Sequence, residues 1–256
     1  MPNSFKHSAS RALSTVLSIL LVGLFLSSCE IPQTATEVIV EGNQYFLKGD
    51  YEKAEVSYRR ALLKSPDNPT AMSNLGVILN ELSKFDEAIA ISKRAIEIDS
   101  KNAIAHYVLA RALSAKGRYD EAFEQATIAT ELDSTDAIGF RTLGEAALGK
   151  GDVDTAINAL EAAIVLEDSN DITHLNLARA YVIKKDLQKA ADELYRALEL
   201  NANNIEARLL LALCLAHLGD KNEALEQLNL LLEKNPQNNE ARELLKKINS
   251  GELPAL

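Results

Sequence analysis

The sequence contains no tryptophan, two cysteines and few of the residues that interrupt regular structure. Six prolines and eleven glycines in 256 residues are too few for a collagen-like or low-complexity chain. Two cysteines cannot form a disulfide-rich scaffold or a four-thiolate zinc site. The 27 basic residues are outnumbered by 37 acidic ones, and the net charge of −10 argues against a nucleic-acid-binding protein. With 47% apolar and 5% aromatic residues, the composition favours a folded and mainly helical protein.

The first thirty residues have the pattern of a secretory signal. Lys6 and Arg11 precede an apolar run, Ala12 to Phe25, that is shorter than the about 20 residues of a membrane-spanning helix. The sequence Leu-Ser-Ser-Cys follows and ends at Cys29. This ending resembles the lipobox of bacterial lipoproteins. The resemblance implies cleavage before Cys29, a thioether-linked diacylglycerol on its sulfur and an acylated amino terminus. An ordinary signal peptide and an uncleaved anchor are the alternatives.

The lipobox resemblance implies a protein held by lipid in the bacterial cell envelope. Residues 1–28 are then the signal peptide and 29–34 a lipidated tether, which reaches roughly 20 Å when extended. Loss of residues 1–28 leaves a body that is more acidic still, so lipid rather than charge must hold it at an anionic bilayer. Glu30 stands where lipoproteins retained at the inner membrane commonly carry aspartate. We therefore expect the outer membrane, with the protein facing the periplasm.

A 34-residue period fills the rest of the chain. Two columns of small residues recur at this spacing, and small side chains let two helix backbones approach closely. The first column comprises Ala54, Ala88, Ala122, Ala156, Ala190 and Ala224, and the second Gly42, Gly76, Ala110, Gly144, Ala178 and Ala212. The predicted units are 35–68, 69–102, 103–136, 137–170, 171–204 and 205–238, followed by a capping helix and tail at 239–256.

Each unit is predicted to form two amphipathic helices joined by a turn. The last position of every unit is a short polar residue, which can accept the free N–H groups that open the next helix. These residues are Asn68, Asn102, Asp136, Asn170, Asn204 and Asn238. Pro66 and Pro236 lie two residues before such a position and are expected to end the preceding helix. The helix predicted after residue 238 would cover the exposed side of the last unit.

This pattern resembles the tetratricopeptide repeat (TPR), whose 34-residue signature runs W-x2-L-G-x2-Y, then A-x3-F, then P. The first unit matches the signature at Gly42, Tyr45, Gly49, Tyr51, Ala54, Tyr58, Ala61 and Pro66. The tryptophan position departs from it and holds Val38, Met72, His106, Phe140, His174 and Arg208. The resemblance implies an all-α, right-handed superhelical solenoid of six helix-turn-helix repeats plus a C-terminal capping helix, with a concave groove for protein partners.

The sequence predicts no enzyme, no cofactor and no metal site. The motifs HExxH, GxSxG, GxxxxGK[ST] and GxGxxG do not occur. His106 and His174 are two repeats apart, which is roughly 20 Å at 8–10 Å per helix layer and too far for a shared metal. Cys214 stands in a column of mostly small or apolar residues and is expected in the core.

The TPR resemblance also implies which side chains face the groove, because the first helix of each repeat lines it. The predicted groove residues are Asn43, Phe46, Ser73, Asn80, Tyr107, Arg111, Arg141, Arg179, Leu209 and Leu213. The three arginines come from successive repeats, roughly 10 Å apart, and a guanidinium suits a carboxylate or acidic peptide. The alternative is that Arg141 merely pairs with Glu145 one turn further on. The apolar run Leu175, Val182, Leu209 and Leu213 suits an amphipathic helix of a partner or of a second copy, and the alternative is that the curvature of the superhelix covers it.

The function predicted from these features is a non-enzymatic, membrane-tethered adaptor for protein partners in the envelope. Family analogy points to the TPR lipoproteins of type IV or tight-adherence pilus and secretion-channel assembly. An adaptor that docks peptidoglycan hydrolases is an alternative, and so is a self-assembling structural lipoprotein. The expected partners are a protein or peptide in the groove and the membrane through lipid on Cys29. A homo-oligomer stays open, and no nucleic acid partner is expected.

Overall fold

The computed structural model describes residues 33–254, and within this range the chain forms thirteen α-helices and no strand. The helices are α2 Ala35–Leu47, α3 Tyr51–Lys64, α4 Pro69–Glu81, α5 Phe85–Ile98, α6 Ala103–Ala115, α7 Tyr119–Leu132, α8 Ala137–Lys150, α9 Val153–Leu166, α10 Asp171–Ile183, α11 Leu187–Leu200, α12 Ile205–Leu218, α13 Lys221–Lys234 and α14 Asn239–Ser250. The predicted signal peptide and Cys29 lie outside the described residues.

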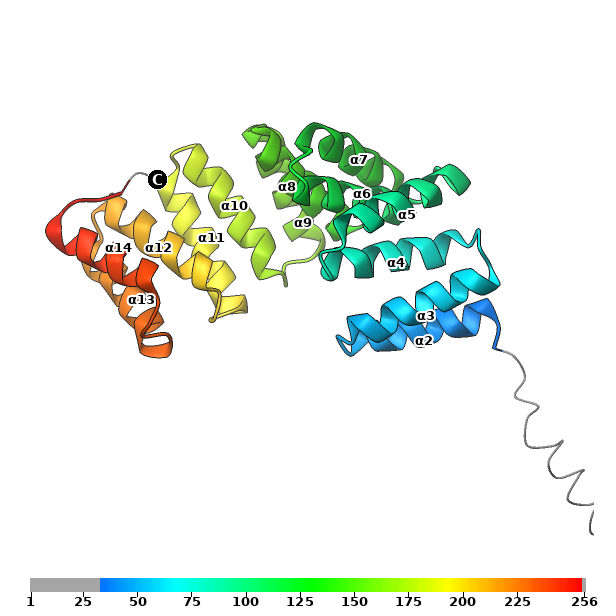
Figure 1. The fold of residues 1–256 in the computed structure, drawn as a ribbon. Coiled ribbons are helices and arrows are strands. Elements are labelled where there is room, and N and C mark those ends of the chain that lie inside the picture. Colours follow the sequence, from blue (N-terminus) through cyan, green and yellow to red (C-terminus); the bar gives the residue numbers. More distant parts are fainter. Residues whose placement is uncertain (1–32, 255–256) are drawn as a thin grey trace, which may run out of the picture.

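The helices are stacked in the order of the sequence. Each helix packs mainly against its neighbours along the chain, and successive first helices (α4, α6, α8) also touch one another. The result is an elongated, curved array that runs from α2 to α14 (Figure 1). This confirms the prediction of an all-α solenoid with a final helix, α14, packed on the last pair. No helix between residues 33 and 254 combines the length and apolar character that crossing a bilayer requires.

The polar residue that ends each predicted unit caps the next helix. Asn68 Oδ1 accepts the N–H of Ala71 at 2.9 Å, and Asn102 Oδ1 accepts that of Ala105 at 3.0 Å. The same capping contact is made by Asp136, Asn170, Asn204 and Asn238. Each such cap contributes about 1 kcal/mol and fixes where a helix begins. The local sequence therefore sets the helix boundaries, and the repeat spacing follows from them.

The columns of small residues lie where two helices approach most closely. All six alanines of the column that begins at Ala54 have no exposed surface. In the glycine column, a Cβ built on Gly42 would stand 2.6 Å from the ring of Tyr58, and one on Gly144 would stand 2.5 Å from Leu160. These distances are shorter than carbon atoms tolerate, so the close approach of α2 to α3 and of α8 to α9 depends on glycine.

The position that holds tryptophan in the TPR signature is a buried polar slot in several repeats. His106 is 5% exposed, with Nδ1 2.8 Å from Gln125 Oε1 and Nε2 3.2 Å from the carbonyl oxygen of Ser100. In the last repeat Arg208 occupies this position. It donates one hydrogen bond to a glutamine side chain of the second helix and one to a backbone carbonyl oxygen of the preceding loop. The slot therefore ties the first helix of a repeat to its second helix and to the loop before it.

His174 occupies this slot between two carboxylates. Its Nδ1 lies 2.7 Å from Glu193 Oε2 and its Nε2 lies 2.9 Å from Asp168 Oδ1, while Arg196 holds the other oxygen of Asp168 at 2.8 Å. Only the imidazolium can donate to both carboxylates at once. Burial lowers the pKa of His174, but the hydrogen bonds and charges of Glu193 and Asp168 outweigh it and raise the pKa above its ordinary value of 6.5.

Raising the pH should therefore weaken the junction that His174 holds. Because its pKa is raised in the folded state, the stabilisation is complete below pH 6.5 and is lost as the pH rises through the folded-state pKa. Asp168 is half exposed and screened by solvent, so we expect a loss on the order of 1 kcal/mol, or about 2–4 °C in melting temperature. Circular dichroism melts at increasing pH should show a smaller decline in melting temperature for His174→Gln and for Glu193→Gln than for the wild type. If the melting temperatures of all three proteins fall equally with pH, this role of His174 is contradicted.

Candidate partner-binding groove

Eight of the ten predicted groove residues line two pockets. The N-terminal pocket, about 440 Å³, is lined from α2, α4, α6 and α8, together with Tyr58 of α3. The C-terminal pocket, about 730 Å³, is lined mainly from α12 and α14, with Arg179 of α10 at its edge. Asn43, Phe46, Tyr107, Arg111 and Arg141 line the first pocket, and Arg179, Leu209 and Leu213 line the second.

Two of the predicted groove residues lie inside the protein instead. Ser73 is 1% exposed and accepts a hydrogen bond from Asn102 Nδ2 at 2.9 Å. Asn80 is 7% exposed and donates to the carbonyl oxygen of Val108 at 2.9 Å. Ser73 thus bonds to the capping residue of α6 and Asn80 bonds to α6 itself, and the stacking of α6 on α4 covers both side chains. A partner in the groove cannot reach either of them.

The N-terminal pocket combines an apolar wall with an ordered polar floor. The apolar lining comes from Phe46, Val77, Ile78, Ile104 and Ile138. On the floor, Asn43 Oδ1 accepts hydrogen bonds from Tyr58 Oη at 2.7 Å and from Asn74 Nδ2 at 3.0 Å. Burial raises the pKa of Tyr107 to about 12, so its hydroxyl stays protonated and able to donate a hydrogen bond at neutral pH.

The three groove arginines differ in how their charge is balanced. Arg111 lies 3.1 Å from Glu81 Oε1, and Arg179 pairs with Glu206. Arg141 has no carboxylate within 4 Å among residues 33–254, and the pairing with Glu145 considered from the sequence is not formed there. Arg141 is therefore the groove arginine that can best receive an external carboxylate.

Glu145 of α8 experiences the positive charge of all three arginines, and among residues 33–254 it forms an ion pair with none of them. Its Oε1 accepts a hydrogen bond from Asn176 Nδ2 at 3.2 Å. Burial raises the pKa of Glu145, although the positive charges of Arg141, Arg111 and Arg179 act in the opposite direction. The carboxylate thus sits in a poorly hydrated part of the concave surface, where a ligand charge would also be weakly screened.

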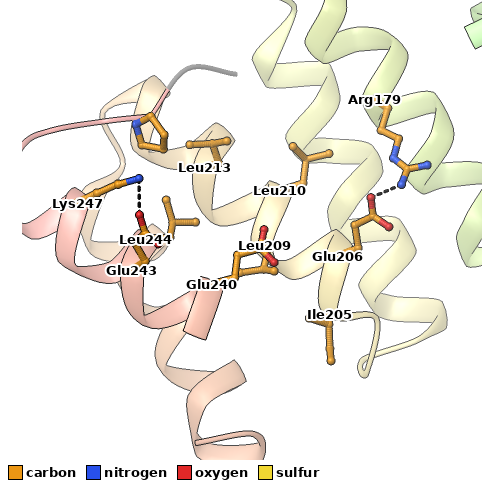
Figure 2. Close-up of a pocket in the computed structure, with 11 residues that line it drawn as sticks. Arg179, Ile205, Glu206, Leu209, Leu210, Leu213, Glu240, Glu243, Leu244 and Lys247 are labelled. Carbon is orange, nitrogen blue, oxygen red and sulfur yellow. Dashed lines mark hydrogen bonds and ion pairs between the residues drawn. The ribbon is translucent and has the colours of Figure 1, made fainter. Parts of the chain in front are cut away.

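The last helix forms one wall of the C-terminal pocket. Figure 2 shows Leu209 and Leu213 of α12 near Leu244 of α14, with Glu240, Glu243 and Lys247 also projecting from α14. Lys247 and Glu243 form an ion pair at 2.8 Å, so part of this wall's charge is neutralised internally. The sequence predicted α14 only as a cap. Its apolar residues at helical spacing were the signal that could have indicated its part in a pocket.

The tail beyond α14 also takes part in this pocket. Pro254 is one of its lining residues, and the Pro254 carbonyl oxygen lies 2.9 Å from Nε2 of His217 on α12. Sequence reasoning missed Pro254, because nothing in the pattern indicates that residues after Gly251 turn back toward α12 (Figure 1).

Metal and thiol chemistry find no support in the described range. Between residues 33 and 254 no three His, Cys, Asp or Glu side chains gather as metal ligands. Cys214 is fully buried, and burial raises the pKa of its thiol to about 11. The reactive thiolate is therefore scarce at neutral pH, as expected for a core residue.

Comparison with known families agrees with the repeat pattern. A TPR repeat model matches residues 42–83, and a tetratricopeptide repeat model matches 79–125. The model of the cytochrome c-type biogenesis protein H TPR domain matches 127–242. These matches cover the stacked helix pairs almost from end to end. The chain is built of tetratricopeptide repeats.

Curated relatives share only short stretches of these TPRs. Stress-induced-phosphoprotein 1 of Caenorhabditis elegans is 37% identical over 70 residues, 27% of this chain and 22% of the relative. The TPR repeat-containing thioredoxin TTL4 of Arabidopsis thaliana is 36% identical over 74 residues, 29% of this chain and 11% of the relative. The chain therefore spans about a fifth or less of the length of these relatives.

Solved TPR structures match a larger share of the chain. The APC/C hetero-tetramer Cut9–Hcn1 superposes with a TM-score of 0.77 and 22% identity, over 86% of this chain and 44% of that chain. Pseudomonas aeruginosa pilF gives 0.70 and 21%, over 83% and 97%. YrrB, a TPR protein with an unusual peptide-binding site, gives 0.59 and 19%, over 74% and 97%. At these identities the likeness concerns the fold.

Proposed function

We propose that this TPR protein is a non-enzymatic adaptor, which holds a protein partner in its groove while lipid on Cys29 keeps it in the bacterial envelope. The observation that carries the proposal is the N-terminal pocket, where Arg141, which has no carboxylate partner within residues 33–254, lies beside an apolar wall. TPR folds are typically scaffolds for protein interaction, and the similar YrrB is described as having a peptide-binding site. The lipid anchor is supported by the Leu-Ser-Ser-Cys motif whose last residue is Cys29.

The N-terminal pocket suits an extended segment that carries a carboxylate next to an apolar side chain. Arg141 supplies a guanidinium for the carboxylate, and Phe46 and Ile104 supply surface for the apolar group. Asn43 and Asn74 offer amide groups for the backbone of such a segment. The chain as a whole is acidic, so the attraction for a carboxylate is confined to this pocket and gives selectivity rather than general binding.

For the envelope pathway, we propose assembly of a pilus or secretion channel. Its support is the likeness to Pseudomonas aeruginosa pilF, whose chain is covered to 97% by the superposition. A second candidate is cytochrome c-type biogenesis, which the family match of residues 127–242 favours. Both candidates use the groove in the same way, and they differ in the identity of the captured partner.

Arg141→Glu should weaken partner capture about tenfold or more. Reversing this charge removes a charge-assisted hydrogen bond of about 1.5–3 kcal/mol to the ligand carboxylate and adds a repulsion. Full-length wild-type and variant proteins would be immobilised in detergent and exposed to solubilised envelope extract. Captured proteins are then quantified by mass spectrometry. Pilin or secretin-type partners favour the first pathway, and components of cytochrome c-type biogenesis favour the second.

The matched control for this experiment is Arg94→Glu. Arg94 is an exposed arginine on α5 that lies outside both pockets and pairs with Asp67, so its reversal changes the net charge equally. We expect it to capture partners like the wild type, and circular dichroism melts should agree among the three proteins. Undiminished capture by Arg141→Glu would refute binding through the N-terminal pocket.

A further inference from the structure

α3 differs from the other second helices of the repeats in its outward-facing side chains. Val56 is 63% exposed and Leu63 is 83% exposed, and a separation of seven residues places them on one side of the helix. The positions equivalent to Leu63 hold Glu97, Glu131, Val165, Glu199 and Glu233, and those equivalent to Val56 hold Ala90, Glu124, Asn158, Asp192 and Glu226. The first repeat thus has apolar residues at two positions that are mostly polar or acidic elsewhere.

α3 also has a net positive charge, unlike the other second helices. Its basic residues are Lys53, Arg59, Arg60 and Lys64, and its acidic residues are Glu52 and Glu55. Lys53, Arg59 and Arg60 form ion pairs with neighbouring carboxylates, so within the range 33–254 Lys64 is the basic side chain of α3 that is left to face an external anion. The equivalent helices α5, α7, α9, α11 and α13 each contain more acidic than basic residues. Exposed apolar side chains together with basic ones on a single helix are typical of a helix that lies on an anionic membrane surface.

The outward face of α3 lies beside the start of the described chain. Arg60 donates a hydrogen bond to Gln33 Oε1 at 2.6 Å, and Leu63 is about one turn further along α3. Cys29 precedes Gln33 by four residues, a stretch that reaches at most about 14 Å. Lipid attached at Cys29 would hold α3 close to the bilayer surface.

We propose that α3 is a second membrane contact, in which Val56 and Leu63 enter the headgroup region of an anionic bilayer beside the lipid on Cys29. This inference rests on the lipid anchor in the proposed function. Lys64, which has no carboxylate within 4 Å in the range 33–254, faces the lipid phosphates. The more acidic second helices are repelled by the same surface. The solenoid therefore stands with its first repeat at the membrane and its C-terminal pocket farthest from it.

The absence of tryptophan from the chain makes lipid contact directly measurable, since one introduced indole is then the only one. Full-length, lipid-anchored Leu63→Trp would be reconstituted in phosphatidylglycerol-containing vesicles with brominated acyl chains. We expect a blue-shifted emission that the brominated lipid quenches at least twofold, and weaker quenching in purely zwitterionic vesicles. Val165→Trp is the matched control, because Val165 occupies the equivalent position in the fourth repeat and is 86% exposed. Its emission should stay red-shifted and unquenched.

Three other results of the fluorescence experiment would overturn the proposal. Equal emission from the two variants on vesicles that carry the protein would overturn the α3 contact and leave the anchor intact. Failure of the full-length protein to float with vesicles would overturn the anchor and the contact together. A blue shift of Leu63→Trp without quenching by brominated lipid would assign the face of α3 to a second copy of the chain, and this too would overturn the proposal.

Discussion

Replacement of Cys29 by alanine should move the protein from the membrane fraction to the soluble fraction of the envelope. Without the sulfur there is no thioether-linked diacylglycerol, and each buried methylene of an acyl chain contributes about 0.8 kcal/mol to anchoring. The contact proposed for α3 adds only two apolar side chains, Val56 and Leu63, worth about 1.5–3 kcal/mol each at full burial. That is too little to hold an acidic body at an anionic surface. Fractionation with immunoblotting measures the outcome.

Cys214→Ala is the matched control for this substitution. Cys214 is the other cysteine of the chain and is buried in the core, so its replacement should leave the protein in the membrane fraction. The comparison also separates the alternatives that the sequence leaves open. With an ordinary signal peptide, the wild type itself would be soluble. With an uncleaved anchor, the wild type would keep residues 1–28 in its measured mass, and either finding would refute lipidation of Cys29.

The fold was predictable because its determinants are local and repeated. A capping side chain such as Asn68 starts a helix, and a small residue such as Ala54 permits the close approach of its neighbour. Both act within one repeat and its immediate successor. The 34-residue spacing then reproduces the same arrangement six times. A departure from the TPR signature at one position, such as the missing tryptophans, therefore does not alter the fold. His174 and Arg208 show this, since polar side chains fill that slot with hydrogen bonds.

The groove was predictable only in part, because its surface depends on how far each repeat covers the one before. Position in the repeat indicates the direction of a side chain but not its depth, so Ser73 and Asn80 were expected in the groove and are buried. The charge balance of Arg141 depends on rotamers and on carboxylates from other repeats. The participation of Pro254 in the C-terminal pocket depends on the path of the tail, which no periodicity encodes.

Gly42→Ala should lower the stability of the first repeat by about 2 kcal/mol, the size expected for overpacking a rigid interface. The added methyl would stand 2.6 Å from the ring of Tyr58, which is 2% exposed and held by its hydrogen bond to Asn43. The ring therefore cannot swing away without breaking that bond. We expect a melting temperature lower by about 4–8 °C at about 2–4 °C per kcal/mol, measured by circular dichroism.

Adding Tyr58→Leu to Gly42→Ala should restore much of that loss. The pairs at the equivalent positions of the fifth and sixth repeats are Ala178 with Leu194 and Ala212 with Leu228, and all four residues are at most 2% exposed in one core. Alanine opposite leucine is therefore a combination that this fold already accepts, whereas alanine opposite tyrosine does not occur in it. Strict additivity of the two substitutions in a double-mutant cycle would contradict the explanation.

Gly139→Ala is the control that separates crowding from any general effect of replacing glycine. A Cβ at Gly139 would lie 3.7 Å from Thr130, an ordinary contact, and Gly139 lies within α8. Alanine loses less backbone entropy than glycine in a helix, by roughly 0.5–1 kcal/mol, so this variant should melt at or above the wild-type temperature. Opposite signs for Gly42→Ala and Gly139→Ala would show that the glycine column is required for close approach of the helices rather than for backbone flexibility.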